Sequence, residues 1–247
     1  MRGGAHGLRA DLLRHRNPAE TTRRRARSQF PSRKDGDCVQ PSARSRQGAD
    51  QILIPRIDTR LIKIGTAIES PQTGERLIFL STADSSNGQL FQAELIVKPG
   101  PYVVRSHIHP SQEERFVVLE GVYGYQIGNR TGVAQPGEAL VCPVGVSHSQ
   151  WNGGQGILRI LYEHRPALTS AEIFFETQFG LSRDGKLSRT GDIKLLQGAV
   201  LLQEVGDFIR PSSPPIYVQN ALFPMLAAIG RMRGYRARYR KYAIRPA

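Results

Sequence analysis

The sequence predicts a mainly β domain, an antiparallel β-barrel or jelly roll, followed by two to three C-terminal helices. From about Gln51 onward the chain consists of short runs at strand spacing, rich in β-branched and aromatic residues. Turns that contain Gly, Pro or Asn separate these runs, as at residues 98–101 and 128–132. After Arg165-Pro166 the apolar period lengthens from two residues to nearly four, which is typical of helices.

Residues 90–97 show the strand period most clearly. Apolar side chains at 91, 93, 95 and 97 alternate with polar ones at 92 and 94, so one face of this strand is expected to be buried. The other expected strands cover residues 77–80, 102–109, 114–119, 122–127, 139–142 and 157–162. Strands of this length, separated by tight turns, favour a sandwich or a barrel.

Helical runs are expected after the strands. Thr169 followed by Glu172 has the spacing of a capping box, and an apolar run follows it. Asp192 is expected to open a second run, and a third is expected over residues 218–239, after the Pro-rich break at 211–215. The predicted organisation is therefore a leader over 1–50, a β-barrel over 51–166 and a helical appendage over 167–241 with a basic tail.

The formal net charge of +13 is concentrated at the two ends of the chain. Residues 1–50 carry twelve Lys and Arg against five Asp and Glu, and residues 231–247 carry seven bases and no acid, whereas the middle is nearly neutral. A neutral middle does not favour a groove that follows phosphates, so nucleic acid is not an expected partner. The leader has hardly any apolar periodicity, and its composition predicts disorder.

Cysteine use and hydropathy suggest where the protein works. Cys38 lies in the polar leader and Cys142 in an apolar strand-like run, so a disulfide between them is not expected. Sparse cysteine fits a reducing compartment. No apolar run is long enough to span a bilayer, and the start of the chain lacks the apolar region of a secretory signal. We expect a cytoplasmic protein, and a peripheral position on a membrane is the alternative.

Three histidines and one glutamate have the spacing of a metal site. His107 and His109 are two apart on an expected strand and therefore project to the same side. Glu114 begins the next strand after a Pro-containing turn, and His148 opens another strand after the turn at 143–145. Three imidazoles and a carboxylate are ligands that suit a divalent transition metal. Two ordinary alternatives are histidines on a solvated sheet face and a barrel that binds no metal.

The same residues resemble the paired motifs of the cupin superfamily. In the first motif the spacing from His107 through Glu114 to Gly121 agrees with the family pattern, although six residues rather than five separate Gly100 from His107. The second motif agrees throughout, at Gly137, Pro143, Gly145, His148 and Asn152. The resemblance implies an RmlC-like jelly roll and the ligand set His107, His109, Glu114 and His148. Glu113 remains the alternative carboxylate.

The resemblance to cupins is compatible with several classes of function. Cupins include dioxygenases, decarboxylases, sugar-phosphate isomerases and plain binding proteins, and Fe, Mn, Ni, Cu and Zn all suit the ligand set. The leading expectation is a metal-dependent enzyme of oxygenase type that acts on a small organic molecule. The alternative is a non-catalytic module that binds or senses such a molecule. Arg105, Phe116 and Gln150 are the candidates for substrate binding, with Arg105 expected on the face of the ligands.

The C-terminal segment allows two interpretations. An apolar stretch over 222–229 is followed by six basic residues between 231 and 241, a combination that can anchor a protein to an anionic membrane surface. A helix that packs on the barrel or pairs in a homodimer, followed by a solvated basic tail, is the alternative that we favour, because Gly230 and Gly234 weaken a continuous interfacial helix.

Overall fold

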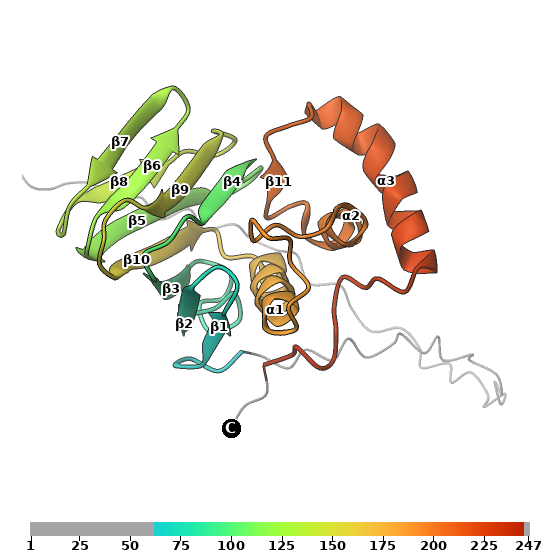
Figure 1. Ribbon diagram of the computed structural model, residues 1–247, viewed down its shortest axis with the longest axis horizontal. Helices are drawn as coiled ribbons and strands as arrows, with labels where there is room; N and C mark the ends of the chain where they lie inside the picture. The colour runs from blue at the N-terminus through green and yellow to red at the C-terminus, as the bar shows by residue number, and fades with distance from the viewer. Residues whose placement is uncertain (1–61, 245–247) are drawn as a thin grey trace, which may run out of the picture. The chain divides into compact units, whose positions relative to one another are not determined.

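The computed structural model describes residues 62–244, and these residues belong to one compact unit. The leader predicted at 1–50, with Cys38, lies outside the described residues. The strands form two sheets on one side of the unit, and the helices gather on the other (Figure 1). The fold is thus mainly β, with a helical layer against the strands.

All strand pairs are antiparallel. One sheet has six strands, in the order β1 (Ala67–Ser70), β2 (Glu75–Ser81), β3 (Phe91–Val97), β10 (Leu158–Arg165), β5 (Glu113–Glu120) and β8 (Ala139–Cys142). The other has five, in the order β11 (Arg210–Pro211), β4 (Val103–Ile108), β9 (His148–Asn152), β6 (Tyr123–Ile127) and β7 (Arg130–Ala134). No hydrogen-bonded strand pair joins the two sheets within residues 62–244, so the barrel is open.

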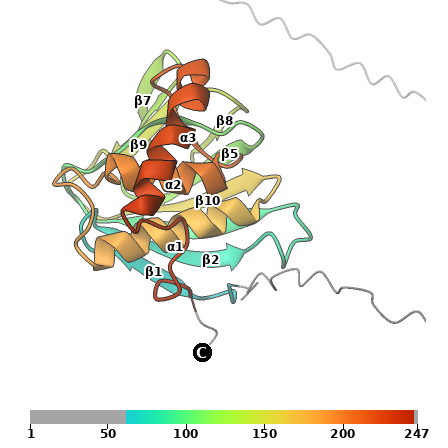
Figure 2. The same cartoon turned by 90° about the vertical axis from the view of Figure 1, so that its right-hand side faces the viewer.

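Three helices follow the strands: α1 (Thr169–Arg183), α2 (Leu195–Val205) and α3 (Ile216–Met232). Helix α1 contacts β1 and α2, and α3 contacts α2 (Figure 2). The predicted fold class, a mainly β jelly roll with two to three C-terminal helices, is confirmed. None of the helices in the described part has the length and apolar content needed to span a bilayer.

The main core lies between the sheets and continues under α1. In β3 buried and half-buried residues alternate strictly, as the sequence pattern predicts. The ring of Phe91 stacks on that of Phe175 from α1, with centroids 5.7 Å apart, and meets Phe79 and Tyr162 edge to face. Aromatic pairs of this kind stabilise a core beyond the area they bury, and here they join the first sheet to the helical layer.

The capping box predicted at the start of α1 is wrong. Leu168 is the N-cap residue, it makes no side-chain cap, and Thr169 is already the first helical residue. Glu172 does not turn back toward the helix start, because its Oε1 accepts a hydrogen bond of 2.8 Å from the backbone N–H of Ala83. A contact with a segment 89 residues away has replaced the local one.

Candidate metal centre

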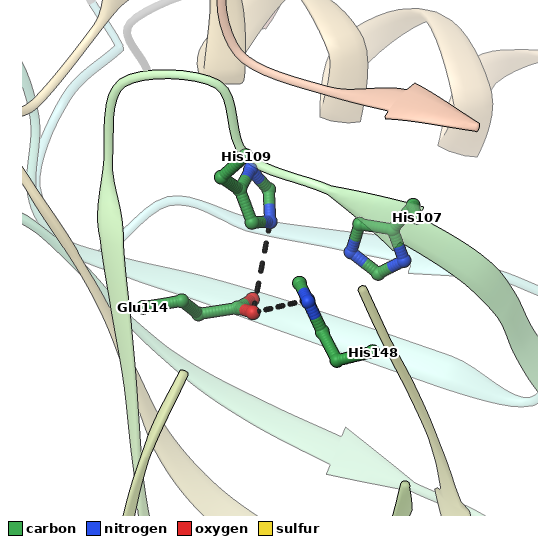
Figure 3. A group of neighbouring side chains, drawn as sticks. All are labelled: His107, His109, Glu114 and His148. Carbon is green, nitrogen blue, oxygen red and sulfur yellow. Dashed lines mark ion pairs between the residues drawn. The ribbon is translucent and has the colours of Figure 1, made fainter. Parts of the chain in front are cut away.

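Four buried side chains meet between the two sheets (Figure 3). His107 lies near the end of β4, and His109 follows that strand. Glu114 is the second residue of β5, and His148 is the first residue of β9. One potential ligand atom from each of the four lies within 4.8 Å of all the others. The structure therefore brings together the four residues that the sequence pattern singles out.

Strand register explains why these side chains meet. His107 pairs directly with His148 across β4 and β9, so their side chains share one face of the five-stranded sheet. In the facing sheet Glu114 is buried, whereas its neighbour Glu113 is exposed, because adjacent residues of a strand point to opposite faces. The structure thus places Glu114, and not Glu113, in the buried cluster. The backbone N–H of Gly145 donates a hydrogen bond of 2.9 Å to the carbonyl oxygen of His109.

Each of the three imidazoles is oriented by a main-chain carbonyl oxygen that lies near its Nδ1. The distances are 2.8 Å from His107 to Arg105, 2.5 Å from His109 to Phe208, and 3.0 Å from His148 to Val146. A carbonyl oxygen can only accept, so each Nδ1 carries the proton and Nε2 is the nitrogen available to a metal. Phe208 precedes β11, so the helical half of the chain positions one of the imidazoles.

The atoms that face the centre lack hydrogen-bond partners. Nε2 of His109, Nε2 of His148 and both carboxylate oxygens of Glu114 are buried, and no hydrogen bond of good geometry satisfies any of them. Oε2 of Glu114 lies 2.6 Å from Nε2 of His148 and 3.6 Å from Nε2 of His109. Buried polar atoms without partners cost free energy. A divalent cation would satisfy all of them at once, so the donor set fits a metal ion.

The pKa values in the centre follow from burial and from the close packing of charges. Burial, together with the neighbouring His148 and His109, lowers the pKa of His107 to about 3. Burial alone would raise the pKa of Glu114, but the nearby His148 and His109 hold it well below its usual range. Burial opposes protonation of His148 too, yet Glu114 and Cys142 outweigh it and raise its pKa to about 10. A metal would take the place of this proton.

A fourth histidine, beside the three of the cluster, adjoins the centre and was not anticipated. His164 of β10 is fully buried and pairs directly with Glu114 across the sheet. Its Nε2 lies 3.6 Å from Oε1 of Glu114, its ring centroid lies 4.5 Å from that of His109, and neither ring nitrogen has a hydrogen-bond partner. Burial lowers its pKa well below the usual range, so the ring is neutral. Every second residue of β10 points inward, at 158, 160, 162 and 164, and this alternation is the sequence signal that could have identified His164.

His107 also lines a cavity of about 260 Å³. Strands β3, β4, β9 and β10 contribute to its wall on one side, and helices α1 and α2 contribute on the other. Most of the lining is apolar, including Leu95, Val104, Phe174, Phe175, Leu201 and Phe208. A mostly apolar pocket with a few polar groups is the usual form of a small-molecule site. The appended helices thus complete a space that the sheets leave open.

A second buried carboxyl, that of Glu75, lines the same cavity. Its Oε2 accepts a hydrogen bond of 2.7 Å from the hydroxyl of Thr73. Burial raises the pKa of Glu75 to about 7, although the bond from Thr73 lowers it in part. This carboxyl therefore changes protonation state near neutral pH. Glu75 lies at the start of β2, far in sequence from the motifs, and nothing in the sequence pattern marked it.

The residues expected to bind substrate occupy three different environments. Gln150 lines the cavity, and its Oε1 accepts a hydrogen bond of 2.8 Å from the hydroxyl of Tyr123. Arg105 lies at the cavity rim with 73% of its side chain exposed, and makes two contacts of 2.6 Å with the carboxylate of Asp192. Phe116 is buried and packs on Tyr123, outside the residues that line the cavity.

An irregularity in β4 explains the position of Arg105. Val104 pairs with Gln150 and His107 pairs with His148, so β4 has one residue more than β9 in this interval. Such a bulge interrupts the alternation of side chains. As a result Arg105 does not project beside His107 as strict alternation would require, and its guanidinium turns to Asp192 instead.

Residues 93–162 match the sequence model of the family described as Cupin domain. Residues 93–162 therefore form a domain of the cupin superfamily. The match covers the strands that carry all four candidate ligands of the cupin site. A search of curated proteins finds no match.

Solved structures also resemble the chain, at low identity and over part of its length. KdgF from Halomonas sp. has 15% identity and a TM-score of 0.36, over 40% of this chain and 84% of that protein. An RmlC-like cupin from Shewanella frigidimarina has 19% identity and a TM-score of 0.35, over 40% and 83%. A predicted oxalate decarboxylase from Thermotoga maritima has 19% identity and a TM-score of 0.37, over 44% and 99%.

Proposed function

We propose that the protein is a metal-dependent enzyme of oxygenase type that acts on a small organic molecule in the cavity beside His107. The observation that carries the proposal is the buried cluster of three histidines and one glutamate, one member of which also lines that cavity. The candidate metals remain Fe, Mn, Ni, Cu and Zn, because the ligand types suit each of them.

The ligand set defines what a metal would contribute. With His107, His109, Glu114 and His148 as ligands, a divalent metal would keep one or two positions open, where it can polarise a substrate oxygen or engage dioxygen. The carbonyl of Phe208 would hold the His109 ring in place, as outer partners of metal-bound histidines do.

The cavity determines the size and polarity of a substrate. A cavity of about 260 Å³ has room for a small molecule and not for a polymer. The apolar wall excludes water from the reacting end, while Gln150 and Glu75 offer hydrogen bonds that can orient polar groups.

The first test is metal content. We expect the purified full-length protein to hold about one metal ion per chain, as plasma mass spectrometry would measure, and Glu114→Gln to lower this content at least tenfold. Glu113→Gln removes the adjacent, exposed carboxylate and is the matched control, which should keep its metal. A wild-type protein that takes up no metal would contradict the proposal.

The second test separates an enzyme from a binding module. The metal-loaded protein is offered a panel of small organic acids, alcohols and aldehydes in air, with binding followed by thermal shift and turnover by an oxygen electrode. The proposal predicts oxygen uptake with at least one compound that binds, and loss of that uptake in His107→Ala. Binding without oxygen uptake or product would instead identify the non-catalytic module.

A further inference from the structure

The outer face of α3 is apolar. Its solvent-facing positions recur three and four residues apart. On the face that points to water, six exposed apolar residues form what we call the outer stripe, and the exposed polar Asn220 and Arg231 lie along its edge. The stripe consists of Tyr217, Ala221, Pro224, Met225, Ala228 and Met232. Tyr217 is 72% exposed, Met225 56% and Met232 80%. The opposite face, with Gln219, Ala227 and Gly230, is buried.

A surface helix ordinarily presents charged and polar residues to water. Helix α3 has a single charged residue, Arg231, and it lies beside the stripe near the end of the helix. Contiguous exposed apolar side chains of this kind mark interaction sites. The outer stripe therefore has the character of a binding face.

The basic segment after α3 is held in place, and it is not a free tail. Gly234, at a φ of 86°, follows the end of the helix. The hydroxyl of Tyr239 donates to Oε1 of Gln197 at 2.5 Å, and Nε2 of Gln197 donates to the carbonyl of Arg236 at 2.8 Å. Exposed arginines then alternate with half-buried residues: Arg236, Arg238 and Arg240 face outward between Tyr235, Ala237 and Tyr239.

This face carries a net positive charge. No Asp or Glu occurs after Asp207 in the sequence. Arg238 makes an ion pair with Glu204, whereas Arg231, Arg233 and Arg240 have no acidic partner among residues 62–244. Helix α3 and the segment that follows it both lie on the side that faces the viewer in Figure 2. The apolar stripe and the unpaired cations thus belong to segments that lie on the same side of the protein.

We propose that this side binds an anionic membrane surface, with α3 lying in the plane of the interface. The stripe would enter the boundary between head groups and acyl chains, and the arginines would contact the anionic head groups. A helix of 17 residues is about 26 Å long, which suits a helix that lies on the membrane. Charge favours lipid over a second copy of the chain, because two such faces would bring the unpaired arginines together, and neither α3 nor the segment after it contains an acid that could pair them.

Vesicle co-sedimentation of the full-length protein tests the proposal. We expect binding to phosphatidylcholine vesicles that contain about 30% phosphatidylserine, and at least tenfold weaker binding to vesicles of phosphatidylcholine alone. Sodium chloride at about 0.5 M should weaken the binding, since it screens the arginines. Equal partitioning to both kinds of vesicle, or to neither, would overturn the proposal.

Matched variants test the two parts of the face separately. Met225→Asp should lower the partition coefficient at least tenfold, whereas Val133→Asp, at a site of nearly equal exposure on β7, should leave it unchanged. Arg233→Ala with Arg240→Ala should lower it about thirtyfold, at about fivefold for each cation. Arg130→Ala with Arg189→Ala removes the same charge elsewhere on the surface and should have little effect.

Self-association is the competing outcome. If light scattering shows a dimer that Met225→Asp dissociates, and vesicles bind neither form, then a second copy covers the outer stripe and the proposal is wrong. Far-ultraviolet circular dichroism of each variant shows that it is folded before binding is compared. Metal content is measured in the same samples, so a failure here is separate from a failure of the proposed enzyme.

Discussion

Exchange of Glu75 for glutamine should stabilise the protein at alkaline pH and leave its stability nearly unchanged in acid. Glu75 is buried, and burial raises its pKa from 4.5 to about 7. A carboxyl whose pKa is higher in the folded protein than in the unfolded chain favours folding while it is protonated. Stability is therefore highest below the unfolded pKa and falls as pH rises from about 4.5 to about 7.

The size of the effect follows from the same two values. At about pH 5 the free energy of unfolding is about 1 kcal/mol lower than in strong acid, because the unfolded chain releases the proton more readily. At about pH 8 the loss reaches about 3 kcal/mol, since each tenfold difference in proton affinity is worth about 1.4 kcal/mol. Glutamine keeps the shape of the protonated carboxyl and an oxygen that can accept the Thr73 hydroxyl, but it does not ionise.

Urea denaturation at about pH 5 and at about pH 8 measures the difference. The advantage of Glu75→Gln over the wild type should grow by about 2 to 3 kcal/mol between these two pH values. Glu69→Gln removes an exposed carboxylate from the adjacent strand β1 and should change stability by less than about 1 kcal/mol at either pH. An advantage of Glu75→Gln that does not change with pH would refute the reasoning.

Three further changes test the centre and its surroundings. His164→Phe should weaken metal binding by about 10-fold, because its buried imidazole is the polar group beside Oε1 of Glu114, 3.6 Å away. Competition with a chelating dye measures the affinity, and an unchanged affinity would show that His164 only fills space. A double-mutant cycle on Arg105→Ala and Asp192→Ala should give a coupling free energy in stability of about 1 kcal/mol or less, since the arginine is exposed. A coupling of about 3 kcal/mol would show that this ion pair is not a weak surface pair. Gly145→Ala should lower the free energy of unfolding, measured in urea, by about 1 to 2 kcal/mol. The space around a Cβ is open at this position, but the φ of 72° disfavours any residue with a Cβ. No measurable loss would mean that the turn relaxes.

The ligand set was predictable from sequence because it depends on short-range geometry. Residues two apart on a strand share a face, and a turn that contains Pro and Gly sets where the next strand begins. His107, His109, Glu114 and His148 all follow from these two rules together with the cupin spacing. The fold class follows in the same way, from the change of apolar period near residue 166.

The surroundings of the centre were not predictable, because they depend on contacts between segments distant in sequence. The carbonyl of Phe208 reaches His109 across 99 residues, and the raised pKa of Glu75 comes from burial that the local sequence does not show. Strict alternation placed Arg105 beside the ligands, but a bulge in β4 turns it toward Asp192. Likewise Glu172 does not cap its own helix, because its carboxylate accepts a hydrogen bond from the backbone of Ala83 in a distant loop.

The sequence alone therefore determined the strand pattern, the helical appendage and the four candidate ligands, since each follows from periodicity and spacing within about fifty residues. Only the tertiary structure decided what encloses them. The helices complete the cavity, His164 joins the centre through strand pairing, and α3 turns an apolar stripe to solvent. These features arise when distant segments bury one another, and burial is a property of the folded chain as a whole.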